Sequence, residues 1–250
     1  MITTVESSRM VVISDLHLGN PFSSQSRQIF EFIRWAAKEG FDVCINGDGL
    51  EIAQSSFTKM TNEVPDFLRA LAEVRRAGRE AYYIVGNHDI ALEHFLDDWG
   101  MMKASPFLNV LSGGRRVRIE HGHLYDPFFV KHPHLYEFLT RLGAIPLRFF
   151  PKSYRLWIRF ERWKSGRRAK RTGITGEPQA FALAAAEIAQ RGFDAVVFGH
   201  THHAGRVDLA EGAEYLNPGS WLLTPHYVEI LEGEVRLKTW SPSRSGGASA

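Results

Sequence analysis

The sequence predicts an α/β protein in which a largely parallel sheet is accompanied by a second, more antiparallel one. Over the first hundred residues, short apolar runs rich in β-branched residues alternate with longer segments of helical periodicity. That alternation is typical of parallel strands joined by helices. The last third instead contains short strand-like runs separated by Glu-Gly turns, which favours antiparallel pairing.

The alternating part is expected to contain strands at 10–14, 42–46 and 81–85, and helices near 24–39, near 64–77 and from about residue 90. A hairpin follows at 107–122, because Gly113-Gly114 supplies the positive φ angles of a tight turn. Regular structure returns after residue 176, with an Ala-rich helix at 178–191 and a strand at 194–198.

The 250-residue chain is expected to form one domain over 1–240, followed by a disordered Ser/Gly-rich tail at 241–250. Prolines, aromatics and arginines interrupt the rhythm between 125 and 176, so we interpret 125–176 as an inserted helical cap. Its stretch 141–171 holds eleven Lys/Arg and only Glu161 as an acid, a net charge of +10 in a chain whose total is +2. The remainder is therefore acidic, and the inserted segment is expected to face an anionic partner.

The single cysteine and the absence of long apolar runs indicate a cytoplasmic protein. Cys44 lies inside an apolar run and has no second cysteine to pair with, so we expect a buried, inert thiol. The amino terminus lacks the layout of a signal peptide, and no run approaches the roughly 18 apolar residues of a spanning helix.

Polar residues of the types that bind metals follow each strand of the parallel set and the hairpin. Carboxyl ends of strands in α/β sheets are where ligand sites assemble. Asp, Asn and His offer oxygen and nitrogen ligands without thiolate, a set that suits Mn²⁺, Fe or Zn²⁺. One such cluster alone would be an ordinary turn, whereas five in this order favour a metal site. The clusters are Asp15/His17, Asp48, Asn87/His88/Asp89, His121/His123 and His200/His202.

The spacing within the clusters suggests how they would grip an ion. Asp15 and His17 are two residues apart, so on an extended segment they face the same way, and His200 and His202 repeat this spacing. A glycine stands immediately before Asp48, and two later clusters share that order. Glycine removes side-chain bulk where the backbone must turn beside a metal or phosphate. His203, next in the chain, is expected on the surface.

The series Asp-x-His, Gly-Asp-x-x-Glu, Gly-Asn-His-Asp, His and Gly-His-x-His resembles that of the calcineurin-like metallophosphoesterases, and "NPGS" at 217–220 is similar to a turn common in that family. The resemblance implies a four-layer α/β/β/α sandwich with two divalent ions between its sheets, Mn²⁺ being expected and Fe or Zn²⁺ the alternatives. It implies one ion bound by Asp15, His17, Asp48 and His202, and a second by Asp48, Asn87, His121 and His200.

The same resemblance implies the chemistry. A hydroxide bridging the two ions would attack a phosphoanhydride or phosphodiester, with no serine or cysteine nucleophile. His88 would be a helper that contacts the phosphate or the leaving oxygen, and Asp89 would orient it.

The inserted segment bears on the substrate. A helix over 154–164 would carry aromatic and arginine residues on opposite faces. Such a helix suits an acyl-chain pocket or an anionic membrane surface, although its aromatic face could simply pack on the domain, and the basic run could also bind nucleic acid. The aromatic face would hold Leu156, Trp157, Phe160 and Trp163, and the basic face Arg155, Arg159 and Arg162.

"SDLHLG", "GDGLE" and a basic helical insertion before "GHTH" together resemble the UDP-2,3-diacylglucosamine pyrophosphohydrolases. That resemblance implies release of UMP and 2,3-diacylglucosamine 1-phosphate, and an insertion that forms a lid over the acyl chains. It also implies an enzyme at the inner face of the inner membrane. Two positions depart from that group: His88 stands where arginine is common, and His123 where aspartate is usual. Candidate substrate contacts are His123, Arg155, Trp157 and Arg159.

Two other functions stay open at this point. The same chemistry could act on a nucleotide or nucleic acid, although nucleic acid is not the partner we expect. A non-catalytic scaffold with this fold is the third reading, and the filled ligand positions argue against it. The sequence indicates no oligomeric state.

Overall fold

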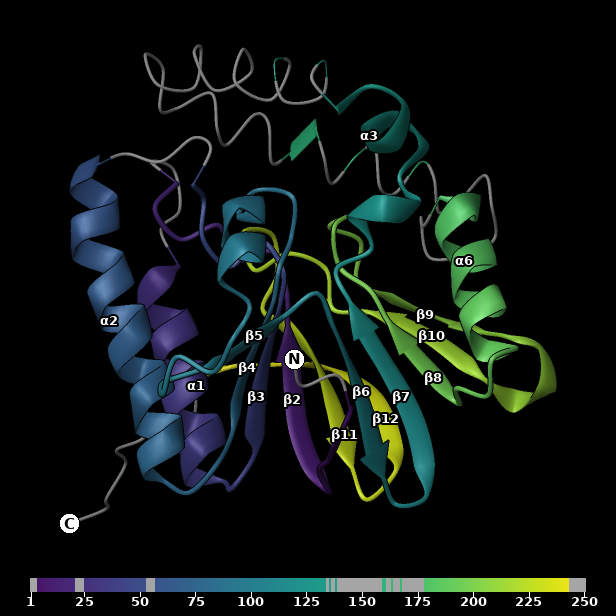
Figure 1. The fold of residues 1–250 in the computed structure, drawn as a ribbon, viewed down its shortest axis with the longest axis horizontal. Helices are drawn as coiled ribbons and strands as arrows, with labels where there is room; N and C mark the ends of the chain where they lie inside the picture. Colours follow the sequence, from purple (N-terminus) through teal and green to yellow (C-terminus); the bar gives the residue numbers. More distant parts are fainter. Residues whose placement is uncertain are drawn as a thin grey trace.

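In the computed structural model, two six-stranded sheets pack face to face, with helices on both outer faces (Figure 1). This arrangement confirms the predicted α/β class and the four-layer order. The structure describes residues 4–20, 25–52, 57–133 and 178–242, together with the single positions 135, 138, 159, 160, 163 and 167.

The first sheet contains the predicted parallel set. Its strands β2, β3, β4 and β5 run parallel, and β11 and β12 add an antiparallel edge beside β2. The strand order is β12-β11-β2-β3-β4-β5. The bounds are β2 Arg9–Ile13, β3 Asp42–Asn46, β4 Ala81–Ile84, β5 Lys103–Ser105, β11 His226–Leu231 and β12 Glu234–Thr239.

The second sheet is mixed, with the order β1-β6-β7-β8-β10-β9. The predicted hairpin is confirmed as β6 and β7, and both of its glycines have positive φ angles. Strands β7, β8 and β10 run parallel to one another. The bounds are β1 Thr4–Glu6, β6 Phe107–Ser112, β7 Arg115–Glu120, β8 Ala195–Val197, β9 Gly205–Asp208 and β10 Glu214–Asn217.

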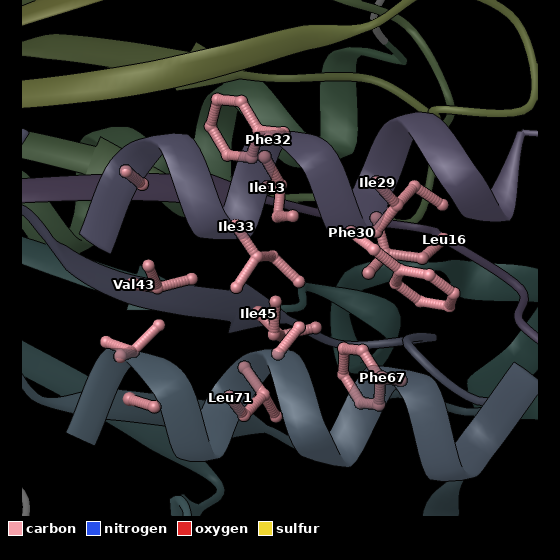
Figure 2. Close-up of a cluster of buried hydrophobic side chains, with 14 of the residues drawn as sticks. Ile13, Leu16, Ile29, Phe30, Phe32, Ile33, Val43, Ile45, Phe67 and Leu71 are labelled. Atoms are coloured by element: carbon pink, nitrogen blue, oxygen red, sulfur yellow. The ribbon is translucent and has the colours of Figure 1, made fainter. Parts of the chain in front are cut away.

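Helices α1 (Ser26–Lys38) and α2 (Phe57–Arg76) cover the outer face of the first sheet, and α6 (Gln179–Ala189) covers the second sheet (Figure 1). The buried residues of α1 follow a spacing of three and four, which places one apolar stripe against the sheet. Figure 2 shows this layer, with side chains of α1 and α2 enclosing those of β2 and β3.

Strands β2 and β3 are buried on both faces, which explains why they appear in the sequence as continuous apolar runs. Along β2, Val11 and Ile13 join the cluster under the helices, while Met10 and Val12 join the cluster between the sheets. Cys44 also lies between the sheets as a free, fully buried thiol. Burial raises its pKa, so the predicted inert thiol is supported.

Three elements differ from the prediction. The helix expected from about residue 90 is a 3-10 turn, η1 (Ile90–Phe95). The helix expected near 64–77 begins at residue 57, ends at residue 76 and contains Pro65 in its interior. The strands of the last third do not form a sheet of their own, because β11 and β12 extend the first sheet while β8, β9 and β10 belong to the second.

The expected cap at 125–176 is described only in part. Its beginning forms the end of the 3-10 turn η2 (His123–Tyr125) and the short helix α3 (Pro127–Lys131). Most of 134–177 lies outside the described residues, as do 243–250 of the expected tail. No helix among the described residues is long and apolar enough to cross a membrane.

Candidate metal centre

Seven of the polar residues that follow the strands converge at one edge of the two sheets. Because β2, β3 and β4 are parallel, and β7 and β8 are parallel, the loops after each set emerge at the same side. Three overlapping groups have their ligand atoms within 4.8 Å of one another: Asp15/His17/His202, His17/Asp48/His88 and Asp48/His121/His200. Six of the seven predicted ligands are therefore neighbours in space, together with His88, and Asp48 and His17 each belong to two of the groups.

The first group presents nitrogen and oxygen atoms to a common point. Nε2 of His202 lies 3.3 Å from Nε2 of His17 and 3.1 Å from Oδ1 of Asp15. That Asp15 oxygen is buried, and its charge is balanced by the His202 ring. A buried carboxylate is stable only beside a positive charge, and a metal ion between these atoms would supply one.

The third group, Asp48/His121/His200, is centred on Asp48. Its Oδ2 lies 3.3 Å from Nε2 of His121, which is 3.2 Å from Oδ1 of Asn87. The same Asn87 oxygen lies 2.9 Å from Nδ1 of His200. The other Asp48 oxygen, Oδ1, accepts the backbone N–H of His88 at 2.8 Å. The mixture of imidazole, carboxylate and amide oxygen fits a divalent ion of the Mn²⁺, Fe or Zn²⁺ kind.

The backbone that carries these ligands is held in an unusual conformation. Outside glycine, positive φ angles are uncommon and cost free energy, so they cluster where function requires them. The sequence spacing suggested extended ligand segments. The positive φ angles show that these segments are not extended, although their side chains still face one another. Five of the seven non-glycine residues with positive φ among the described residues are Asp15, His17, Asp48, His200 and His202.

Hydrogen bonds from neighbouring loops fix the ligand orientations. Nδ1 of His121 lies 2.9 Å from the carbonyl oxygen of Asn46, which can only accept, so Nδ1 carries the proton and Nε2 is left for an ion. Nδ1 of His17 is 3.0 Å from Oε2 of Glu51, with the same consequence. The "NPGS" turn contributes as well, since Asn217 donates to the carbonyl of Gly199 at 2.9 Å.

Glu51, not Asp89, orients His88. Oε1 of Glu51 lies 2.8 Å from Nδ1 of His88. The Asp89 carboxylate instead accepts the backbone N–H groups of Gly49 at 2.9 Å and Gly86 at 2.6 Å, and the Tyr83 hydroxyl at 2.5 Å. The expected Asp89–His88 contact is therefore wrong, and Asp89 joins the loops that follow β3 and β4.

The charges of the centre stabilise one another. Burial alone would raise the pKa of Asp48, but His121 and His88 hold it well below its usual value. Conversely, burial would lower the pKa of His121 and His88, but Asp48 raises these pKa values to about 10 and about 9. Burial would likewise raise the pKa of Glu51, but His17 and His88 lower it to about 2. Protonated imidazoles balance the carboxylates here, and divalent ions would take over that role.

The remaining candidate residues fall into two sets. His123 is buried beside His121, at 5.5 Å between ring centroids, and burial followed by the charge of His121 lowers its pKa to about 3. His203 is buried too, so its predicted surface position is wrong. Arg155 and Trp157 lie outside the described residues, and Arg159 is exposed and helical.

The sequence-based site omitted two residues. Glu51 stands in the quoted Gly-Asp-x-x-Glu motif, but its double contact with His17 and His88 depends on the folded loops. Asp126 lies 3.0 Å from Nε2 of His200 and begins α3, which no local pattern connects with a residue 74 positions later.

Replacing Gly86 by alanine is expected to abolish activity while leaving the fold intact. A Cβ at this position would lie 2.2 Å from Oδ1 and 2.5 Å from the backbone nitrogen of Asp48, so the carboxylate shared by two ligand groups must move. Turnover and metal content would be measured beside Gly78→Ala, which strains the backbone at a φ of 73° but places its Cβ within 4 Å of nothing, and so controls for a general loss of stability. Equal activity of the two variants would contradict a central role for Asp48.

Comparisons with known proteins agree with this geometry. Residues 8–204 match the family described as "Calcineurin-like phosphoesterase". No curated protein matches the sequence.

Three solved structures are similar at low identity, and their TM-scores are too low to bear on activity. A Thermotoga maritima protein solved by NMR is 18% identical, with 94% of this chain and 99% of that chain covered and a TM-score of 0.44. An Aquifex aeolicus protein of unknown function is 14% identical over 83% of each chain, with a TM-score of 0.41. A Danio rerio dimetal phosphatase is 12% identical over 93% of this chain and 99% of that chain, with a TM-score of 0.48.

Proposed function

The chain belongs to the calcineurin-like phosphoesterase family, whose members are hydrolases of phosphoester bonds, and we propose that its active site holds two divalent ions that share Asp48. The observation that carries this proposal is the position of Asp48 between the ligand groups. When bound, such ions activate water and neutralise the charge that develops on phosphoryl oxygens. Asp15, His17, Asp48 and His202 would hold one ion, and Asp48, Asn87, His121 and His200 the other.

The protein residues keep the ligand atoms in position before any ion binds. Glu51 and the carbonyl of Asn46 accept the outward protons of His17 and His121. Nε2 of each ring is thereby left with a free lone pair that can bind an ion. We propose Mn²⁺ as the resident ion, with Fe and Zn²⁺ as alternatives, since all three suit nitrogen and oxygen ligands without thiolate.

His88 is the residue that we propose as the proton donor or electrostatic partner of the phosphoryl group. Its Nδ1 contacts Glu51, while Nε2 remains 4.0 Å from Oδ2 of Asp48, toward the centre. In the metal-free centre burial would lower the pKa of His88, but the charge of Asp48 raises it to about 9. A protonated imidazole so placed would stabilise a phosphoryl oxygen or supply a proton to the leaving oxygen.

We propose a lipid-linked sugar diphosphate, such as UDP-2,3-diacylglucosamine, as the substrate. Apolar side chains are exposed around the start of the insertion, where Leu124, just before it, is 66% exposed and Val130, within it, is 54% exposed. Further along, Phe160 and Trp163 are each 53% exposed, and the Arg167 guanidinium lies 4.2 Å from the Trp163 ring centroid. Exposed apolar groups beside cations suit a molecule with acyl chains and phosphates.

The direct test is release of UMP from UDP-2,3-diacylglucosamine by purified protein supplied with Mn²⁺. Release would support both the reaction and the substrate. Hydrolysis of a small chromogenic diester without release of UMP would retain the two-ion chemistry and reject the lipid substrate.

The double variant Phe160→Ser/Trp163→Ser is expected to lose about 10- to 100-fold in kcat/KM on the diacyl substrate and little on a small diester. Full burial of one such side chain contributes roughly 1.5–3 kcal/mol, and about 1.4 kcal/mol corresponds to a factor of ten. Because Phe160 and Trp163 are each 53% exposed, an acyl chain would cover about as much of the pair as one fully buried side chain. Leu183→Ser is the matched control, because Leu183 is 58% exposed on α6 outside the insertion. Similar losses on both substrates would argue against an acyl-chain contact.

A nucleotide or nucleic acid is the second candidate substrate, favoured by the basic run 162–171. Several contacts from Lys/Arg to phosphates would make nucleic-acid binding steeply dependent on salt. Weak binding that does not change between low and moderate salt would remove this candidate.

A further inference from the structure

Asp126 connects the start of the insertion with the metal centre through two different oxygens. Oδ1 accepts the backbone N–H groups of Phe128 at 2.8 Å and Phe129 at 3.4 Å, so Asp126 caps the first turn of α3. Oδ2 lies 3.0 Å from Nε2 of His200. A carboxylate can only accept when ionised, so Nε2 of His200 is the donor in this contact.

The fold places Asp126 at this point through packing on both sides of the contact. Gly122, with a φ of 92°, turns the chain after His121 into η2, which ends at Tyr125. The Tyr125 ring stacks on Phe198 at 5.2 Å, and Phe198 stands two residues before His200. The segment that carries Asp126 and the segment that carries His200 are thereby held together independently of the hydrogen bond.

The His200 ring is fixed from two further directions. Phe181 of α6 stacks on it with a centroid distance of 6.0 Å and an angle of 21° between the rings. On the opposite side from Nε2, Nδ1 lies 2.9 Å from Oδ1 of Asn87, the ligand atom expected for the same ion. A proton held on Nε2 leaves Nδ1 as the nitrogen with a free lone pair.

We propose that Asp126 is a positioning residue that keeps the Nε2 proton of His200 in place, so that Nδ1 faces the second ion. Hydrogen bonds of this kind orient a ligand ring and increase its basicity, and their loss costs about 10- to 100-fold in metal affinity. Since Asp126 also caps α3, the helix that opens the insertion is linked to the metal centre. This inference rests on the proposed two-ion site.

Two substitutions separate the cap from the contact with His200. Serine and asparagine both cap helices well, so Asp126→Ser and Asp126→Asn should retain α3. Serine is too short to replace the contact with Nε2. Asparagine that caps with its oxygen turns its amide N–H toward Nε2, which then accepts and leaves the proton on Nδ1.

The experiment is a calorimetric titration of metal-free wild type and both variants with Mn²⁺ alone. We expect the wild type to bind two ions. In Asp126→Ser, one of the two should bind about 10- to 100-fold more weakly than in the wild type. In Asp126→Asn, the same ion should bind no more tightly than in Asp126→Ser. Unchanged affinities would show that Asp126 only caps α3, and equal weakening of both ions would show a general loss of structure; either result overturns the inference. A wild type that binds no Mn²⁺ would overturn the proposed function itself.

Discussion

Asp48→Asn is expected to reduce kcat by at least about 10²- to 10³-fold, the range found when one charge-stabilising group is removed from an active site. Asp48 is the carboxylate that two ligand groups share, and its Oδ2 faces His121 at 3.3 Å. Asparagine has the same shape and can still accept the His88 N–H through Oδ1. The loss therefore arises from charge and coordination and not from misfolding.

Turnover of a chromogenic diester and metal content per chain would be measured together for this variant. Asp208→Asn, an exposed change on β9, is the matched control and should behave like the wild type. An Asp48→Asn protein that keeps both its metal content and its kcat would contradict the assignment of Asp48 as the shared ligand.

Removal of the bound ions by a chelator is expected to lower the melting temperature by roughly 10 °C. A ligand present at about 1,000 times its dissociation constant stabilises the folded state by about 4 kcal/mol, and in a chain of this size each kcal/mol moves the melting temperature by roughly 2–4 °C. The candidate ligand atoms are also close enough to share one ion, since Nε2 of His17 lies 3.3 Å from Nε2 of His202.

Readdition of Mn²⁺ should restore the melting temperature of the wild type, and should restore less of it in Asp48→Asn. Calorimetric scans with and without the chelator measure both effects. Identical scans for wild type with and without ions would show that no ion binds the folded protein with useful affinity.

The convergence of the candidate ligands was predictable from the sequence because strand ends mark them locally. Each ligand cluster follows an apolar run, and parallel strands bring such ends to one edge of a sheet. The hairpin was equally accessible, because Gly113 and Gly114 readily adopt the positive φ angles of a tight turn. The fold class followed from the same alternation.

Other features depended on tertiary contacts that no local pattern encodes. Strands β1 and β5 have three residues each, too few for a recognisable period, and the sheet to which β11 belongs is decided by its pairing with β2. Asp89 was expected to orient His88 as an implication of the family resemblance, whereas its carboxylate accepts N–H groups of the loops after β3 and β4. Neighbours in sequence commonly point in different directions.

The central claim is that two ions bound at the shared Asp48 are required for phosphoester hydrolysis. It is tested most directly by adding Mn²⁺ stepwise to metal-free protein while hydrolysis of a chromogenic diester is followed. We predict no turnover without metal and a rise that ends at two equivalents per chain. Full activity in the metal-free protein, or none at saturating Mn²⁺, Fe²⁺ and Zn²⁺, would contradict the claim.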